Sequence, residues 1–387
     1  MEDVVIVEAV RTGIGRGDPT RGQYRDMHAN DLLGACFQAV LARSGVSADL
    51  VEDVIAGCVL PYGEQSSNVA RNAWLQAGLP ETVPATTVDR QCGSGQQAVN
   101  FAAALIASGH ADIVVAGGVE HMSGVPFAAE EASRERFGTP WPERLLDRHE
   151  LVPQGISAER VAERWGITRE ELDDVSLRSH RRAAAAWADG RFAAEVVPVM
   201  VGGEPMTVDQ GIRPDTSVEA LARLRPVFMA DGRVTAGNSS QISDGAAALL
   251  LASREVAERL GLPVRARIVD HVSVGVDPVL MLTGPVPATE RILGRNRLSF
   301  GEVDRYEVNE AFAAVLCMWE REIRADPETV NVNGGAIALG HPLGASGARL
   351  LTSLVHELQR AEARHGIVTM CCRGGLGIAT LLERMDA

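Results

Sequence analysis

The sequence predicts an α/β protein built from two related halves, with a mainly helical segment inserted between them. Short runs of β-branched residues alternate with helical patterns up to about residue 123 and again after residue 265. The stretch between them, residues 124–242, is instead rich in arginine, glutamate and proline. Strands that alternate with helices indicate βαβ units, so we expect two βαβ-rich halves packed as alternating layers of sheet and helix.

The first alternating region contains strands and helices in regular succession. Its strand-like segments are rich in valine, isoleucine and threonine, and its helical segments repeat small or apolar residues with a helical period. The expected elements are a strand at Val4–Val7, a helix at Asp31–Arg43, strands at Val54–Ile55 and Thr86–Asp89, a helix at Gln96–Ser108, and a strand at Ile113–Ala116 that ends at two glycines.

The inserted segment predicts helices rather than a strand–helix alternation. They are expected at Ala158–Trp165 and Glu170–Asp189, where Ser157 and Thr168 have side chains suited to cap a helix N-terminus. Most arginines of this segment are expected to form a solvated surface.

The region after residue 265 repeats the order of the first. In the first half, a strand leads to a turn at Cys92–Gly95, then to a helix, a strand and two glycines. In the second half, a glycine-rich turn at Gly340–Gly344 leads to a helix at Ala345–Gln359 and a strand at Ile367–Met370, followed again by two glycines. A duplicated α/β unit would bring the two turns to one shared end of its sheets, where α/β proteins bind ligands.

The length of 387 residues favours two or three domains. We expect an N-terminal domain over residues 1–123 and 243–264, an inserted loop domain over residues 124–242, and a C-terminal domain over residues 265–387.

The composition excludes several classes of function. A net charge of -14 argues against nucleic acid or an anionic membrane as the main partner, and no apolar run reaches the length of a membrane span. The chain contains no lysine, which excludes Schiff-base chemistry at that residue. Its six cysteines show neither a disulfide framework nor C-x-x-C spacing, and the N-terminus lacks the basic region of a signal peptide. We therefore expect no metal site and a reduced, cytoplasmic setting.

Two residues stand out as candidates for chemistry. Cys92 precedes a helix, whose N-terminal N–H groups stabilise a thiolate, although a small cysteine that merely fills a tight turn fits the local sequence equally well. His341 lies in the glycine-rich stretch NGGAIALGHPLGASGAR. Glycine lets a ligand approach the backbone closely, which favours a catalytic base over a structural histidine.

Two further candidates are weaker when taken alone. Cys371 ends a strand-like run beside Cys372, and neighbours on a strand point to opposite faces, so only one of them is expected to line a site. Asn309 lies where a strand pattern changes to a helical one, a position that also suits a helix cap.

These motifs, taken together and in this order, closely resemble the thiolases, the family of acetyl-CoA acetyltransferases and 3-ketoacyl-CoA thiolases. The resemblance extends over nearly the whole chain. The motifs that carry it are VRTGIGR (residues 10–16), VIAGCVLP (54–61), CGSGQQAV (92–99), VVAGGVEHMS (114–123), GISAERVAERWGITREELD (155–173), TAGNSSQISDGAAALLL (235–251), VNEAFA (308–313), NGGAIALGHPLGASGAR (333–349) and CCRGGLGIAT (371–380).

The resemblance implies a role for each candidate. Cys92 would take the acyl group as a thioester, His341 would deprotonate Cys92, and Cys371 would act as acid and base at the α-carbon of acetyl-CoA. His341 and a water held by Asn309 would form one oxyanion hole. The backbone N–H groups of Cys92 and Arg373 would form the other; in thiolases the position of Arg373 is commonly glycine, so the arginine is a departure from the pattern.

The resemblance also implies coenzyme A thioesters as substrates, with no permanently bound cofactor. Ser240 matches a serine that contacts pantetheine, and Arg223 and Arg225 of the inserted segment are expected near the phosphates. Thiolases assemble as dimers or tetramers, so a homo-oligomer is expected.

The family leaves the substrate and direction of reaction open. Gln154 occupies a position where many short-chain thiolases carry methionine, which favours degradation of a larger fatty or steroid-derived acyl chain over biosynthesis of acetoacetyl-CoA. Two other interpretations are a ketoacyl or hydroxymethylglutaryl-CoA synthase, which shares the fold, and a thiolase-like CoA or lipid binder without catalysis. The second cysteine and GHPLG favour a thiolase over the first, and the presence of all four catalytic candidates argues against the second.

Overall fold

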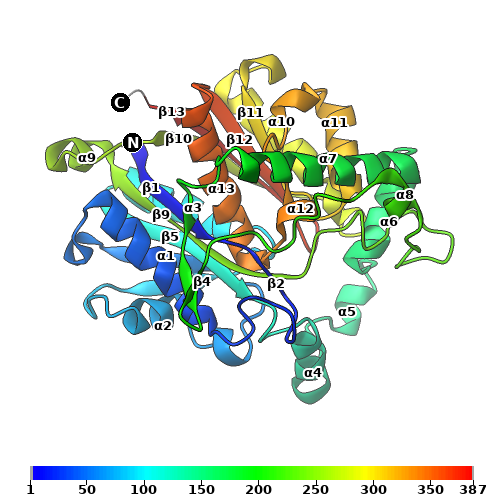
Figure 1. The fold of residues 1–387 in the computed structure, drawn as a ribbon, viewed down its shortest axis with the longest axis horizontal. Helices are drawn as coiled ribbons and strands as arrows, with labels where there is room; N and C mark the ends of the chain where they lie inside the picture. The colour runs from blue at the N-terminus through cyan, green and yellow to red at the C-terminus, as the bar shows by residue number, and fades with distance from the viewer. Residues whose placement is uncertain (1–2, 386–387) are drawn as a thin grey trace.

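The computed structural model describes residues 3–385 and shows helices packed around one large, strongly twisted sheet (Figure 1). Residues 1–2 and 386–387, at the outer ends of the two expected terminal domains, lie outside the described residues. Among the residues described, no helix combines the length and the apolar character that crossing a membrane requires.

The sheet has 11 strands, and its main path runs β11-β12-β13-β10-β1-β9-β5-β3-β4. These nine strands are β1 (Val4–Thr12), β3 (Asp53–Gly57), β4 (Ala85–Val88), β5 (Ile113–His121), β9 (Ser243–Ser253), β10 (Ala266–Gly275), β11 (Arg305–Val308), β12 (His365–Cys372) and β13 (Leu376–Arg384). The short strands β2 (Gly15–Arg16) and β6 (Val196–Val197) pair with β9 and β1.

The two halves of this sheet have the same topology. In the first half, β1 pairs antiparallel with β9, β9 antiparallel with β5, and β5 parallel with β3. In the second half, β10, β13, β12 and β11 pair in the same order and with the same directions. A short antiparallel contact between β1 and β10 joins the halves. The faint repeat in the sequence therefore corresponds to a duplicated unit.

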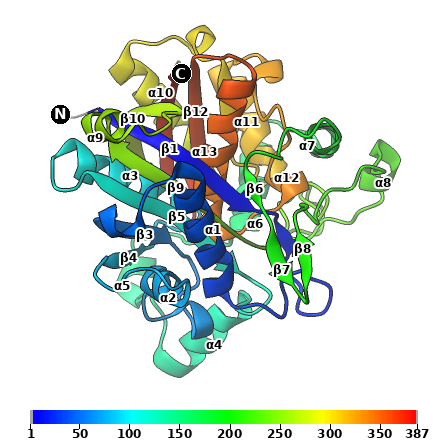
Figure 2. The same cartoon turned by 60° about the vertical axis from the view of Figure 1, so that its left-hand side comes forward.

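Helices cover the sheet in layers, as the sequence predicts. The first outer layer contains α1 (Ala29–Ser44) and α2 (Val69–Gln76), and Figure 2 shows α1 lying over β1, β9 and β5. The central layer contains α3 (Ser94–Ala107) and α13 (Leu343–Arg360), whose apolar side chains share one core with strands of both halves. The second outer layer contains α10 (Pro285–Asn296) and α11 (Ala313–Ile323).

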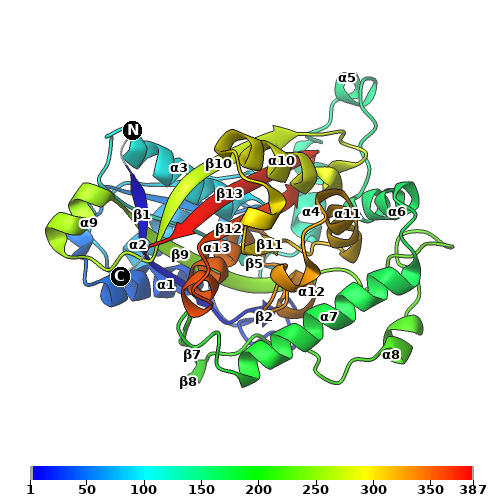
Figure 3. The same cartoon turned by 90° about the horizontal axis from the view of Figure 1, so that it is seen from above.

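The inserted segment is mainly helical and lies along one side of these layers. Figure 3 shows its longest helix, α7, on the outside of the molecule beside α12 (Ala336–Leu339). Its elements are α4 (Ala128–Phe137), α5 (Glu143–Leu146), α6 (Gln154–Arg164), α7 (Arg169–Ala188), β6, the hairpin of β7 (Val199–Val201) and β8 (Glu204–Met206), and α8 (Val218–Ala222). Helix α9 (Arg254–Leu260) links β9 to β10.

Three local expectations can be compared with the structure. Thr168 caps α7 in a capping box with Glu171, as predicted. The prediction for Ser157 is wrong, because α6 begins at Gln154 after Pro153 and Ser157 is buried inside the helix. The prediction that β5 ends at its two glycines is also wrong, since β5 continues to His121. Glycine is needed in β5 for close packing rather than for a turn: a Cβ on Gly118 would lie 2.1 Å from the carbonyl oxygen of Gly344.

Candidate active site

The N-termini of the two central helices lie against each other. A Cβ on Gly95, in the first turn of α3, would lie 2.6 Å from the carbonyl oxygen of Gly344 in α13. A Cβ on Gly347 would lie 2.4 Å from the backbone nitrogen of Gln96. Real Cβ atoms do not approach backbone atoms this closely, so these glycines allow the two helices to start side by side. The turns that carry Cys92 and His341 are thereby brought together, as the repeat predicts.

Both residues line a cavity of about 750 Å³. Cys92 and His341 are nearly enclosed, with 3% and 4% of their surfaces exposed. Other parts of the wall come from the inserted segment and from the turn before β9, including Ser240, Phe228 and Arg213. A second cavity, of about 390 Å³, shares Cys92, Phe127, Gln154 and Leu343 with the first. The two cavities therefore adjoin each other, and Cys92 borders both.

The hydrogen bonds of His341 define its tautomer. Its Nδ1 lies 2.5 Å from the hydroxyl oxygen of Ser346, one turn along α13. The single hydroxyl hydrogen of Ser346 is donated to the carbonyl oxygen of Pro342 at 2.8 Å. The hydroxyl oxygen must then accept a hydrogen from Nδ1, which leaves the lone pair on Nε2. The side-chain amide of Asn309 lies 3.4 Å from this Nε2.

Burial keeps the reactive side chains neutral at rest. It raises the pKa of the Cys92 thiol to about 11, although the backbone N–H groups of Arg373 and Cys92 and the Gln154 amide stabilise the thiolate. Burial, followed by the positive charge of Arg349, lowers the pKa of His341 to about 3. Gln154 Nε2 is 4.0 Å from Cys92 Sγ, which agrees with its expected position near the acyl group.

The paired cysteines at the end of β12 face opposite ways. Cys371 belongs to the outer core of the second half, which reaches Ala311 beside Asn309. Cys372 belongs to the central core, and its Sγ lies 2.7 Å from where a Cβ of Gly93 would be. Burial raises the pKa of both thiols, and interaction with Cys92 raises them further. Asn309 lies in the loop between β11 and α11 and does not cap the helix, whose N-cap position is Phe312.

Comparisons with known proteins identify the family. The chain matches the thiolase N-terminal domain over residues 4–255 and the thiolase C-terminal domain over residues 262–384. The chain belongs to the thiolase family. The predicted fold class and the predicted acyltransferase of the thiolase type are confirmed.

Several relatives are similar over their whole length. The chain is 46% identical to the steroid 3-ketoacyl-CoA thiolase FadA6 of Mycobacterium tuberculosis, with 100% of this chain and 95% of that protein covered. It is 45% identical to an acetyl-CoA acetyltransferase of Pseudomonas aeruginosa, with 99% and 100% covered. The crystal structure of the Bacillus anthracis acetyl-CoA acetyltransferase superposes with a TM-score of 0.91 at 40% identity, with 100% and 99% covered.

A buried carboxylate supports the histidine turn of this thiolase. Glu120 of β5 accepts hydrogen bonds from the backbone N–H groups of Val59, Leu60 and Gly344 at 2.8–3.0 Å and from the Gln65 amide. Burial raises its pKa to about 6. Glu120 therefore fixes the start of α13 against β5, next to His341.

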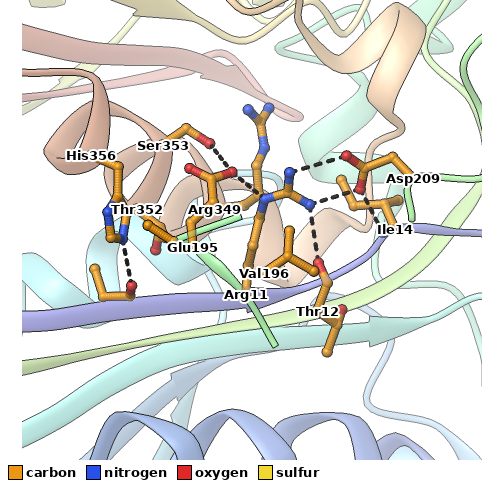
Figure 4. Close-up of polar contacts among 12 residues, drawn as sticks. Arg11, Thr12, Ile14, Glu195, Val196, Asp209, Arg349, Thr352, Ser353 and His356 are labelled. Atoms are coloured by element: carbon orange, nitrogen blue, oxygen red, sulfur yellow. Dashed lines mark hydrogen bonds and ion pairs between the residues drawn. The ribbon is translucent and has the colours of Figure 1, made fainter. Parts of the chain in front are cut away.

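A buried ion network anchors the middle of the same helix (Figure 4). Arg11 of β1 is fully buried and pairs with Asp209 and Glu195, both from the inserted segment. Ser353 of α13 donates a hydrogen bond to Glu195 at 3.1 Å. Arg349 lies beside Arg11, and its Nη1 is 3.7 Å from a carboxylate oxygen of Glu307. The network ties α13 to β1 and to the inserted segment, and so holds the helix that begins at His341.

The arginines along the larger cavity differ from the expected ones. Arg223 and Arg225 are exposed and do not line it, because α8 ends at Ala222 and the chain after it turns along the surface. The arginines that do line it are Arg16, Arg21 and Arg213.

Ser346 and Glu120 belong to the site but are not among the residues that the sequence patterns predict for it. A signal for Ser346 is present, because a hydroxyl five residues after a histidine can reach it once a helix starts between them. Glu120 gives no such signal, since its partners are backbone groups from other segments.

Proposed function

We propose that this thiolase catalyses the CoA-dependent thiolysis of 3-ketoacyl-CoA to acetyl-CoA and a shortened acyl-CoA through an acyl-Cys92 intermediate. The observation that carries the proposal is that Cys92 borders both cavities, with His341 in the wall of the larger one and the lone pair of its imidazole on Nε2. The substrate is proposed to be a degradative one, a fatty or steroid-derived acyl chain, in line with the names of the 3-ketoacyl-CoA thiolases that this chain resembles.

In the first half-reaction His341 removes the proton of Cys92, and the sulfur attacks the 3-keto carbon of the substrate. Because the resting pair is neutral, the proton is transferred as the attack occurs rather than beforehand. The carbon–carbon bond between C2 and C3 then breaks. The acyl group remains on Cys92 as a thioester, and the two departing carbons leave as the enolate of acetyl-CoA, which Cys371 protonates.

Donors placed at the developing oxyanions stabilise both half-reactions. One pair consists of the backbone N–H groups of Cys92 and Arg373, which already act on the sulfur at rest. The other consists of His341 and a water held by Asn309, whose amide lies beside the ring. Each such donor contributes about 3–4 kcal/mol in comparable sites. In the second half-reaction, Cys371 takes the proton of the CoA thiol, the CoA sulfur attacks the acyl thioester, and His341 returns its proton to the released sulfur of Cys92.

Coenzyme A is proposed to occupy the larger cavity. Ser240 lies in its wall and would contact the pantetheine chain. The phosphates would meet Arg213 and Arg16 along this cavity, while Arg223 and Arg225 are exposed farther along the inserted segment. These cations give an acidic protein a local positive surface for an anionic substrate.

We also propose a homodimer or homotetramer in the cytoplasm. Strand β4 ends the main path of the sheet, and its outer edge has no strand partner among the described residues. Unpaired edges of this kind are sites where a second chain adds to a sheet. All six cysteines are free thiols, which suits a reducing compartment. Light scattering on the purified protein would give twice or four times the mass of one chain; a monomer would contradict the assembly.

The test of the function is a product assay on 3-ketoacyl-CoAs of graded length, starting with the four-carbon acetoacetyl-CoA. With free CoA present, the wild-type enzyme should yield acetyl-CoA and an acyl-CoA two carbons shorter. Cys92→Ala should lower kcat by about a thousandfold or more, since Cys92 is the one nucleophile among the described residues that borders both cavities. Thiolysis by Cys92→Ala at the wild-type rate would refute the mechanism, and reaction of the four-carbon substrate alone would refute the degradative assignment.

A further inference from the structure

The smaller cavity beside Cys92 has polar and charged residues in its wall, which thiolysis of a plain alkyl chain does not require. Under the proposed function, the larger cavity takes coenzyme A, so the acyl chain extends into the smaller one. This cavity of about 390 Å³ is bordered by the segment from Val59 to Tyr62, by Trp141 and by the side chain of Arg373. An unsubstituted alkyl chain is held best by an apolar wall, because polar groups that lose water to an alkyl chain gain no new partner.

The wall is polar over much of its area. Asp89, Gln91, Glu130, Gln154 and Arg373 all border the cavity. An unsubstituted chain would displace water from these groups without replacing its hydrogen bonds. The wall therefore fits a chain that carries a polar group of its own.

Arg373 borders this space and has donors that no described residue engages. Its Nη1 contacts both oxygens of Glu130, at 2.9 Å and 3.1 Å, and its guanidinium lies 5.4 Å from the centre of the Trp141 ring. Its Nε and Nη2 donate no hydrogen bond to any of the residues that the structure describes. The side chain is about one-third exposed, at 32%. A donor group fixed by its other contacts is well suited to bind a hydrogen-bond acceptor on a ligand.

The wall of the smaller cavity carries more acidic than basic side chains. Glu130 also pairs with Arg134 at 2.5 Å, and Arg134 lies 4.1 Å over the same tryptophan ring without lining the cavity. The second acid in the wall is Asp89, whose interaction with Arg373 is attractive and with Glu130 repulsive. The wall therefore holds two carboxylates and one guanidinium, that of Arg373. A ligand group with no net charge fits this wall better than an additional carboxylate, which the two acids would repel.

We propose that the smaller cavity selects acyl chains that carry an uncharged oxygen function, a hydroxyl or a ketone, beyond the thioester, and that Arg373 donates hydrogen bonds to that oxygen. The selection rests on the proposed thiolase function and names the class of substrate for it. Arg373 then has two separate roles: its backbone N–H faces the sulfur, and its side chain selects the acyl chain.

The experiment compares 3-ketoacyl-CoAs of equal length whose chains end in a methyl, a hydroxyl or a carboxylate group, at six, eight and ten carbons. The wild-type enzyme should process the hydroxyl-ended member of at least one length with a kcat/KM at least tenfold above its methyl-ended partner. In Arg373→Met, which keeps the backbone donor, this ratio should fall at least tenfold. Arg134→Met is the matched control: it removes the other guanidinium on Trp141 but lies outside the cavity wall, so the ratio should persist.

Three results would overturn the proposal. They are equal or faster thiolysis of the methyl-ended chains at every length, a preference for the carboxylate-ended chains, and a loss of the ratio in Arg134→Met as large as in Arg373→Met. Failure of the underlying function would look different, because wild-type enzyme would then cleave none of the substrates, acetoacetyl-CoA included.

Discussion

The hydroxyl of Ser346 is expected to control the chemistry of His341, and Ser346→Ala tests this directly. Ser346 is fully buried, and its oxygen is the acceptor that keeps the proton on Nδ1. Without it, a buried N–H loses its partner, which costs about 1–3 kcal/mol. The ring can then move its proton to Nε2, which removes the lone pair that faces the substrate side. At 1.36 kcal/mol per tenfold in rate, kcat/KM for thiolysis should fall about 5- to 150-fold.

Ser353→Ala is the matched control for this variant. It removes one buried serine hydroxyl from the same helix, with its hydrogen bond to Glu195 at 3.1 Å, but has no contact with His341. It should lower the stability of the fold by about 1 kcal/mol and leave kcat/KM within about twofold of wild type. The assay is steady-state thiolysis at saturating CoA, with circular dichroism to verify folding. A folded Ser346→Ala enzyme with wild-type kcat/KM would refute the assignment of the tautomer.

Three other predictions concern the same site. The rate of Cys92 alkylation by iodoacetamide should rise about tenfold per pH unit between pH 6 and pH 9. The reason is that burial raises the pKa of the Cys92 thiol to about 11 and lowers the pKa of His341 to about 3. A plateau of the rate in this pH range would instead reveal a thiolate–imidazolium pair. Cys371→Ala should abolish turnover but still allow Cys92 to be acylated by acetyl-CoA. Cys372→Ala should keep turnover within about tenfold of wild type. Loss of turnover in Cys372→Ala but not in Cys371→Ala would exchange the roles of the two cysteines. Gly344→Ala should lower the free energy of unfolding by about 1–3 kcal/mol in chemical denaturation, because its Cβ would lie 2.6 Å from the Val119 carbonyl oxygen. Gly294→Ala, in an exposed and uncrowded part of α10, should instead raise the free energy of unfolding by about 0.5–1 kcal/mol. Equal effects of the two substitutions would contradict the packing argument.

Helices and strands that depend on local residue patterns could be predicted from the sequence. Helices such as α1 and α13 lie within a few residues of their predicted bounds, because their apolar residues repeat with a helical period. The duplicated order of turn, helix and strand also predicted that Cys92 and His341 would meet. These features depend on short stretches of chain, which a single sequence displays directly.

Contacts between distant segments are not visible in the sequence. The glycines in β5 resembled a turn because sequence does not show that Gly118 packs against Gly344, more than two hundred residues away. Which arginines of the inserted segment line the larger cavity is hidden for the same reason, because it depends on how distant parts of the chain fold together. Arg373 departs from the family pattern in the sequence itself, but its contact with Glu130 depends on the fold.

The central claim is that the acyl group is carried by Cys92, and peptide mass spectrometry of the acylated enzyme tests it most directly. The enzyme is mixed with a 3-ketoacyl-CoA without free CoA, quenched in acid and digested. The mass of the shortened acyl group should appear on the peptide that contains Cys92, and should be absent from Cys92→Ala. An acyl group on the peptide of Cys371 and Cys372, or steady thiolysis with no acylated Cys92 at any time, would contradict the account.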